Sequence, residues 1–319
     1  MIDNLLFISD VRSLLPGARF ITVATIRKFE AQSSPAAGRM LRLDAADRSG
    51  ALNAVIFNSH PKFAAFDAKA PSGLVFIRGT ADIYRGAFSP KIDDITPAPS
   101  EAEYIERVQR TSERPVDEMK NELASLLCLL SSDVRAAVED VLASVSPEYY
   151  SHPAAIAVHH NHRHGLIEHT LSSIQVARFL CQKYSSLSPR EGIVIASLII
   201  HDCGKVKEYD SGTTTSFATA GLLQDHISFA HAQWTAAAIR HKVPDDIAQH
   251  IGHCVLAHHG ERQRGSPVEP HTIEAWIVHL ADYTDSRFGI LASALADDST
   301  SPVVQSKYAG PIVRASASI

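Results

Sequence analysis

Hydrophobic and polar positions alternate over the first hundred residues in the manner of β-strands. ARFITVATIRKFE and GRMLRLDAADRSGALNAVIFN are rich in β-branched and aromatic residues, and a turn at residues 47–50 divides the second stretch into two strands. PKFAAFDAK predicts a short helix or turn, and GLVFIRGTADIYRGAFSPKIDDI predicts two further strands that turn near Arg85 and Gly86. Five strands with a helix between the third and the fourth is the element order of an OB-fold barrel.

Beyond residue 115 the spacing of apolar residues is helical. Pro189 and Pro244 stand where the first turns of helices would begin. Apolar residues recur every three or four positions in VDEMKNELASLLCLLSSDVRAAVEDVLASV, LIEHTLSSIQVARFLCQKY, PREGIVIASLIIHD, HISFAHAQWTAAAIRHK, DDIAQHIGHCVLAHH and HTIEAWIVHLADYTDSRFGIL. This half of the chain is therefore predicted to be an all-α bundle.

The proline-rich, acidic stretch DDITPAPSEAEYIER separates the two patterns. The predicted fold class is a multi-domain chain, with an N-terminal all-β OB-fold barrel followed by a C-terminal all-α helical bundle. We expect the barrel over residues 1–100, a linker over 101–115, the helical domain over 116–292 and an extended tail over 293–319. A length of 319 residues agrees with two domains.

The composition, 45% hydrophobic and 20% charged residues, is that of a globular protein. No apolar run approaches the ~18–20 residues that span a bilayer, and the N-terminal stretch has no basic segment typical of a signal peptide. The four cysteines are scattered without CxxC pairing. We therefore expect a reduced, cytoplasmic protein with no membrane partner.

Histidine and charge are unevenly distributed. Of 17 histidines, 16 lie between His152 and His279, and such crowding favours metal binding. Residues 1–100 hold 12 Lys and Arg against 9 Asp and Glu, whereas the rest of the chain holds 18 against 26. A mildly basic half suits a polyanion and an acidic, histidine-rich half suits cations.

An OB-fold barrel binds single-stranded nucleic acid through basic and aromatic side chains on one face. The alternative is that the aromatic residues fill the barrel core and the basic residues form a solvated face. The basic candidates for substrate binding are Arg27, Lys28, Arg39, Arg42, Arg78 and Arg85, and the aromatic candidates are Phe57, Tyr84 and Phe88.

Four helical-domain residues form a candidate metal site, because they lie in or at the ends of three separate apolar helices that can pack together. They are His169, the pair His201 and Asp202, and Asp282. Mixed nitrogen and oxygen ligands of this kind suit Mn²⁺, Fe²⁺, Mg²⁺, Co²⁺ or Zn²⁺. Asp202 can reach a second ion through its other oxygen, and the candidates to complete that second site are His226, His258 and His259.

Two ions can activate water and hold the oxygens of an in-line displacement at phosphorus. Lys205, three residues after Asp202, can meet a phosphate oxygen or the leaving group as a cation. We therefore expect Asp202 and Lys205 to be catalytic, with one or two ions per chain. His159, His160, His162 and His241 are expected to face solvent or to lie behind the ligands.

The motifs EHT (168–170), HDCGK (201–205) and LAD (280–282) resemble the H…HD…D signature of the HD-domain metal-dependent phosphohydrolases. HHNHRHGLIEHTL, IIHDCGKVKEY, GLLQDHI and the stretch from HCVLAHHG to LADYTDSR are similar, in order and spacing, to the YhaM-type 3′–5′ exoribonucleases. The resemblance covers roughly residues 15–290, and that group also carries an N-terminal OB-type domain.

The resemblance implies a hydrolase, often activated by Mn²⁺, that removes nucleotides from the 3′ end of RNA or single-stranded DNA, and some relatives form homo-oligomers. It assigns His169, His201, Asp202 and Asp282 to the HD ligands, His226, His258 and His259 to a second metal, and Lys205 to phosphoester cleavage. Two positions depart from the family pattern: Asp225 and His164 stand where glycine is usual. Asp225 adds a carboxylate that either binds metal or weakens substrate approach.

Two other functions remain open from the sequence. The same chemistry can act on a small nucleotide, such as a cyclic or deoxynucleoside phosphate, with the barrel as a regulatory or assembly module, because fold does not decide substrate. The chain can also be a nucleic-acid-binding protein with a degenerate metal site, although the intact H…HD…D set argues against this.

Overall fold

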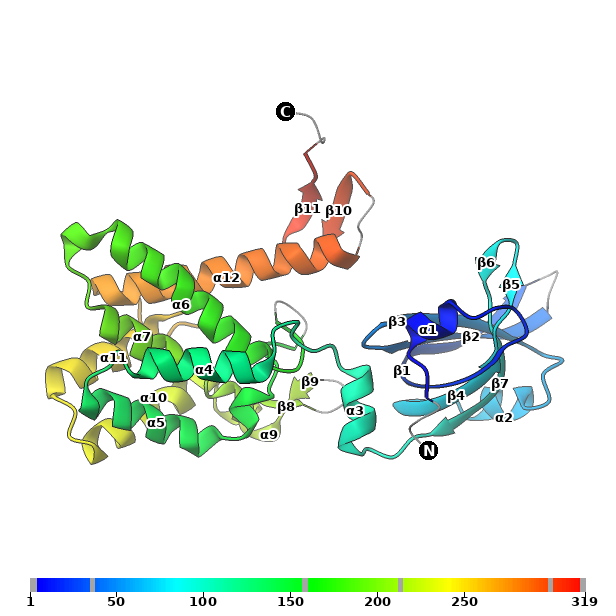
Figure 1. The fold of residues 1–319 in the computed structure, drawn as a ribbon, viewed down its shortest axis with the longest axis horizontal. Helices are drawn as coiled ribbons and strands as arrows, with labels where there is room; N and C mark the ends of the chain where they lie inside the picture. The colour runs from blue at the N-terminus through cyan, green and yellow to red at the C-terminus, as the bar shows by residue number, and fades with distance from the viewer. Residues whose placement is uncertain (1–4, 35–37, 157–159, 212–214, 298–300, 316–319) are drawn as a thin grey trace. The chain divides into compact units, whose positions relative to one another are not determined.

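A computed structural model describes residues 5–34, 38–156, 160–211, 215–297 and 301–315 (Figure 1). They form two compact units, one made mainly of Met1–Thr111 and the other of Ser112–Ser211 with Thr215–Ile319. Each unit has its own hydrophobic core. No helix within the described ranges is both long enough and apolar enough to cross a membrane.

The first unit is a curved antiparallel sheet in the strand order β3-β2-β1-β4-β7. Strands β3 and β7, at the two edges of this order, also contact each other. The strands and the helix between the third and fourth are β1 (Arg19–Ser34), β2 (Gly38–Asp47), β3 (Gly50–Phe57), α2 (Phe63–Ala68), β4 (Leu74–Thr80) and β7 (Lys91–Pro97). This is the order of an OB-fold, which confirms the predicted β class of this half.

Alternation along the strands explains the core of this unit. In β2, Leu41 and Leu43 are buried whereas Arg42 between them is exposed, and the partner strand β3 repeats the pattern with Leu52 and Ile56. Side chains two residues apart lie on the same face of a strand, so one face fills the interior and the other meets solvent. The sequence pattern therefore sets the register of the sheet.

The stretch between β4 and β7 differs from the expectation of two simple strands. It contains a small extra hairpin, β5 (Ile83–Tyr84) and β6 (Ala87–Phe88). Arg85 and Gly86 form its turn with positive φ values of 51° and 79°. Ile83 and Tyr84 on its first strand are exposed, whereas Phe88 on its second strand packs against the barrel core.

Two short helices were not predicted. Helix α1 (Ile8–Arg12) buries Ile8 and Val11 in the barrel core. Helix α3 (Ala102–Val108) lies inside the stretch expected to be a linker. It is held because Tyr104 packs edge-on against Phe76 of the sheet, with ring centroids 5.3 Å apart.

The second unit is a bundle around α7 (Glu191–Ile200), whose residues from Ile193 to Ile200 are all buried. A helix that is apolar on every side belongs at the centre of a bundle, and α7 contacts four others. The remaining helices are α4 (Val116–Leu127), α5 (Ser132–Val145), α6 (Gly165–Lys183), α8 (Lys205–Glu208), α9 (Thr219–Leu223), α10 (His226–Arg240), α11 (Asp245–Ala257) and α12 (Ile273–Asp297). The predicted all-α class is thus confirmed, apart from a small hairpin of β8 (Tyr209–Ser211) and β9 (Thr215–Phe217).

Within the stretch 293–319, expected to be an extended tail, most of the described residues, 293–297 and 301–315, form helix or strand. It begins within α12 and then forms a hairpin of β10 (Val303–Ser306) and β11 (Gly310–Val313), seen beside the end of α12 in Figure 1. Val304 is buried, and the guanidinium of Arg314 donates to the carbonyl oxygen of Leu295 at 2.9 Å. These contacts hold the hairpin against the helix.

Candidate metal centre

Three helices bring the expected ligands of the first site together. His169 lies at the start of the second turn of α6, His201 and Asp202 directly follow α7, and Asp282 lies within α12. His169 Nε2 is 3.1 Å from Oδ1 of Asp282 and 3.4 Å from Oδ2 of Asp202. His201 Nε2 is also 3.4 Å from Oδ2 of Asp202. The end of the central helix α7 meets the faces of α6 and α12 that carry the other expected ligands. Its terminal His-Asp pair therefore lies beside them.

A second group of imidazoles lies on the other oxygen of Asp202. Oδ1 of Asp202 is 3.5 Å from Nε2 of His226 and 3.8 Å from Nε2 of His258. His226, His258 and His259 offer ligand nitrogens that all lie within 4.8 Å of one another. Asp202 thus stands between two groups of ligands, with one oxygen toward each.

These residues fit a divalent ion, because several of their polar atoms are buried without a hydrogen-bond partner. Among the described side chains, this holds for Nε2 of His201, Nε2 of His226, Nε2 of His258 and Oδ1 of Asp202. Such orphaned atoms are costly unless something absent from the protein itself satisfies them. All four converge on Asp202, so cations between these atoms account for the arrangement.

Backbone carbonyls hold three of the imidazoles in the orientation that a metal requires. His201 Nδ1 contacts the carbonyl oxygen of Leu198 at 2.8 Å, and His258 Nδ1 contacts that of Val255 at 2.7 Å. His259 Nδ1 lies 3.1 Å from another carbonyl oxygen, in the loop after α11. A carbonyl only accepts, so each Nδ1 carries the proton and each Nε2 keeps its lone pair for a metal.

Carboxylates hold the other two imidazoles, and sequence reasoning missed both of them. His169 Nδ1 makes a hydrogen bond with Oδ2 of Asp285 at 2.7 Å. His226 Nδ1 lies 2.8 Å from Oε2 of Glu208, which is an ion-pair contact without hydrogen-bond geometry. Carboxylate–histidine–metal arrangements fix the ring and raise its basicity. The sequence offered the same signal for both carboxylates, a spacing of three residues from a predicted site residue. Asp285 follows Asp282 by three residues, and Glu208 follows Lys205 by three.

The electrostatics around His201, His258 and Asp202 favour the protonation states that bind metals. Burial lowers the pKa of His201 and of His258, which keeps both imidazoles neutral. Burial alone would raise the pKa of Asp202, but the ammonium of Lys205, 2.6 Å from Oδ2, holds it well below its ordinary value. Asp202 is therefore a carboxylate at neutral pH.

The position next to His169 favours a cation. Burial lowers the pKa of His169, but contact with Asp282 and Asp285 outweighs this and raises it to about 10. Two carboxylates on one buried imidazole, Asp282 at Nε2 and Asp285 at Nδ1, leave an excess of negative charge around the ring. A divalent ion bound there would be stabilised by the same excess.

The residues that depart from the family pattern have local structural roles. Asp225 is the N-cap of α10, where its Oδ1 accepts from the backbone N–H of Ser228 at 2.7 Å. His164 precedes α6 with φ 67°, a left-handed conformation that explains why glycine also suits this position. The structure thus gives Asp225 a capping role, and its expected effect on metal binding or substrate approach stays a prediction.

The four histidines that were expected to face solvent or to lie behind the ligands have different surroundings. His160 contacts Asp285 at 3.0 Å and therefore lies behind His169, and His162 contacts Glu168. His241 lies 3.1 Å from Asp140, on the helices α10 and α5. His159 lies outside the described residues.

Two of the six basic residues expected on the barrel are paired with carboxylates. Lys28 Nζ lies 2.9 Å from Glu30, and Arg39 makes a two-pronged contact with Asp67 at 2.8 and 2.9 Å. All four side chains are at least partly exposed, so these pairs add little to stability.

The other four lie on different parts of the barrel unit. Arg27 sits at the β-bulge of β1, and Arg42 is exposed on β2. The half-buried Arg78 donates to a threonine hydroxyl of β7 at 3.3 Å. The guanidinium of Arg85 lies 5.3 Å from the ring centroid of Tyr84 in the hairpin of β5 and β6.

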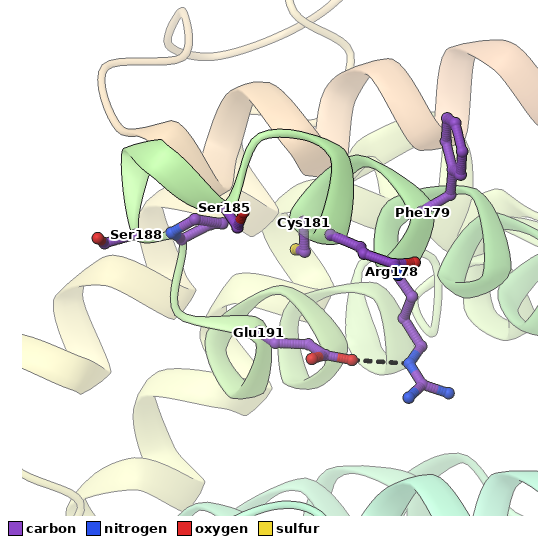
Figure 2. A pocket seen from close by; sticks show the side chains of 8 residues that line it. Arg178, Phe179, Cys181, Ser185, Ser188 and Glu191 are labelled. Atoms are coloured by element: carbon purple, nitrogen blue, oxygen red, sulfur yellow. Dashed lines mark hydrogen bonds and ion pairs between the residues drawn. The ribbon is translucent and has the colours of Figure 1, made fainter.

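A cavity of about 590 Å³ elsewhere in the bundle holds no comparable chemistry (Figure 2). Its walls come from the end of α6 and the start of α7, where Arg178 and Glu191 form an exposed ion pair at 2.7 Å. Cys181, which lines it, is twelve residues beyond His169 on the same helix, which is roughly 18 Å at the rise of an α-helix. The metal centre and this cavity are therefore separate.

Comparison with known proteins agrees with this geometry. Residues 166–287 match the family described as HD domain. The chain is 28% identical over 228 residues to the 3′-5′ exoribonuclease YhaM of Bacillus subtilis, covering 71% of this chain and 72% of that one. It is 28% identical over 251 residues to the protein of the same name from Bacillus velezensis, with 78% and 79% covered. For Shouchella clausii YhaM the identity is 26% over 288 residues, with 89% and 87% covered.

Among solved structures, a mitochondrial single-stranded DNA binding protein from S. cerevisiae, Rim1, matches 25% of this chain and 95% of its own, at 19% identity and a TM-score of 0.20. The HD match spans the expected ligands, which lie in α6, α10 and α12 and directly after α7 and α11. Residues 166–287 are therefore an HD domain whose buried histidines and aspartates imply a divalent metal, in a chain similar to YhaM exoribonucleases over most of its length.

Proposed function

We propose that this chain is a metal-dependent phosphodiesterase that removes nucleotides from the 3′ end of RNA or single-stranded DNA. The observation that carries the proposal is Asp202, a buried carboxylate with imidazoles of two separate groups on its two oxygens. HD-type chemistry at such a site acts on phosphoesters, and the relatives named 3′-5′ exoribonuclease support a nucleic-acid substrate.

The residues themselves have distinct roles in this proposal. His169, His201, Asp202 and Asp282 hold one ion, and His226, His258 and His259 hold a second one together with Asp202. When bound, such ions lower the pKa of a water molecule and neutralise charge on the phosphate oxygens. Asp285 and Glu208 keep His169 and His226 in their ligand orientation.

Lys205 supplies a positive charge at the edge of the site. Its Nζ lies 2.6 Å from Oδ2 of Asp202, and its side chain is nearly buried. A cation held there can stabilise a phosphate oxygen or the oxygen that leaves, because its position is set before substrate binds. The Lys205–Asp202 contact also keeps the Asp202 carboxylate ionised.

We propose Mn²⁺ as the ion, since the chain resembles a group that is often activated by Mn²⁺. The clustered imidazole nitrogens and carboxylate oxygens, which include no thiolate, are compatible with that ion. We expect His226→Ala to lower the Mn²⁺ content of the loaded protein from about two ions per chain to about one, because one ligand group is lost and the other remains. Elemental analysis after removal of free metal measures this. A wild-type content of about one ion that His226→Ala leaves unchanged would contradict the second ion and reassign His226 to substrate contact.

We further propose that the barrel guides the strand through Arg27, Lys28, Arg39, Arg42, Arg78 and Arg85. The surface ion pairs of Lys28 and Arg39 are weak enough for a phosphate to replace their carboxylates. Replacing Arg27 and Arg42 together by alanine should reduce the salt slope of RNA binding by about 1.4, because each phosphate contact on a single strand contributes about 0.7. Binding measured by fluorescence anisotropy at several salt concentrations gives this slope.

Lys69, an exposed lysine next to α2, provides the control for that measurement. A loss of about 0.7 in the slope of Lys69→Ala, the value for one phosphate contact, would show that any barrel charge contributes. An unchanged slope in the double variant would remove the two arginines from the binding face.

The experiment that tests the proposed activity uses RNA labelled at its 5′ end and a panel of divalent metals. A ladder of progressively shortened labelled products supports a 3′–5′ exonuclease. Intact RNA together with hydrolysis of a small nucleotide would instead favour a small-nucleotide hydrolase.

A further inference from the structure

Two arginines and a tyrosine form a cluster beside the metal centre. The guanidinium carbon of Arg264 lies 4.8 Å from the ring centroid of Tyr283, and that of Arg287 lies 5.9 Å from it. Tyr283 is 37% exposed, so its ring meets both guanidinium groups and solvent. We call Arg264, Tyr283 and Arg287 the Arg–Tyr cluster.

The backbone ties this cluster to ligands of both groups. Tyr283 directly follows Asp282 on α12, and the carbonyl oxygen of Arg264 accepts from Nδ1 of His259 at 3.1 Å. Arg264 belongs to the short helix η4 (Arg262–Arg264), in the loop after α11. The cluster therefore keeps a fixed place relative to the metal centre.

The charge of the cluster is unusual for its surroundings. Residues 101–319 hold 26 acidic against 18 basic side chains, yet two guanidinium groups meet on one ring here. Arg264 has one acidic contact, with Glu261 at 3.4 Å, and both of these side chains are about half exposed. A pair this exposed is weak and leaves the guanidinium available to a stronger anion.

Part of the cluster has a structural explanation. Arg287 donates to the carbonyl oxygen of Tyr308 at 3.3 Å, in the turn of the C-terminal hairpin. That contact accounts for Arg287 as an anchor of the hairpin. It does not account for Arg264 or for the partly exposed ring of Tyr283, and the inference therefore rests on these two.

Resting on the proposed nuclease function, we propose that the Arg–Tyr cluster binds a nucleotide adjacent to the scissile phosphate. The base stacks on the ring of Tyr283, and the guanidinium of Arg264 pairs with a phosphate oxygen of the strand. Aromatic faces accept any base, and a planar guanidinium matches the geometry of phosphate. The cluster thus acts in substrate binding and takes no part in the bond cleavage itself.

The test uses the full-length, metal-loaded protein with two substrates, a short RNA and a nitrophenyl phosphodiester. We expect Tyr283→Ala to raise KM for RNA about tenfold, in the range found for base–aromatic stacking, while turnover of the small ester stays unchanged. Tyr283→Phe should restore RNA binding because it keeps the ring. Arg264→Ala should reduce the salt slope of RNA binding by about 0.7, as one phosphate contact is lost.

Phe288→Ala provides the matched control, because Phe288 is an exposed aromatic residue on the same helix and belongs to no part of the cluster. Its KM for RNA should equal that of the wild type. An unchanged KM in Tyr283→Ala would overturn the inference. An equal loss of RNA and ester turnover would overturn it as well, since Tyr283 would then merely support Asp282.

The failure of the proposed function gives a different result. In that case the wild-type protein itself would leave RNA intact while it hydrolyses the ester, and the inference would fall with the function. If the wild type degrades RNA and the cluster variants degrade it with the same KM, the function stands and the cluster is excluded as a binding site.

Discussion

Asp202→Asn is expected to abolish hydrolysis, with a loss of at least about 10³-fold in kcat. Its two oxygens face both groups of imidazoles, so the exchange of carboxylate for amide weakens both sites together. Loss of a residue that only orients a ligand already costs about 10–100-fold, and loss of a shared ligand should cost more. Single-turnover assays at saturating Mn²⁺ measure the effect.

The fold should survive this substitution, because asparagine has almost the same volume as aspartate. The contact with Lys205 loses its charge, so we expect a lower free energy of unfolding by about 1–3 kcal/mol. Asp246→Asn provides the control: Asp246 is a mostly exposed aspartate in the first turn of α11, with a loose contact to Arg190 at 3.7 Å. An Asp202→Asn protein with more than a tenth of wild-type activity would contradict the shared-ligand role.

Gly204→Ala is expected to damage the site without touching a ligand. A Cβ at Gly204 would lie 2.2 Å from the carbonyl oxygen of His226 and 2.7 Å from its Cα. The turn after Asp202 and the start of α10 must therefore move apart, which displaces His226 from the other ligands. A misplacement of about 1 Å can cost about 10²-fold in rate, and overpacking typically costs about 1–3 kcal/mol in stability.

Gly192→Ala is the matched control for this prediction. Gly192 lies in the first turn of α7, where an added Cβ meets nothing nearer than a leucine methyl of Leu130 at 4.0 Å. Alanine within a helix is favoured over glycine by about 0.5–1 kcal/mol, so this variant should unfold at the same or a higher temperature with unchanged activity. Equal activity and equal unfolding temperature of the two variants would show that the site does not need the close approach of Gly204 to His226.

The sequence by itself was sufficient for the class of each half, and it named the expected ligands that the structure brings together. Strand alternation and helical spacing depend on neighbouring residues, so they can be read along the chain. The apolar run before His201 predicted a buried helix that ends in metal-capable side chains, and the structure places that helix at the centre of the bundle. The types and order of the residues in the H…HD…D pattern indicated the HD domain, and the family match confirmed it.

Only the tertiary structure decided how these side chains are supported and paired. His169 and Asp285 are 116 residues apart, and their contact exists because α6 and α12 pack side by side. Local patterns also cannot show that Arg39 meets Asp67, which is 28 residues away along the chain. A hydrogen bond or ion pair depends on distances of a few ångströms between elements, and those distances are set by the packing of the whole core.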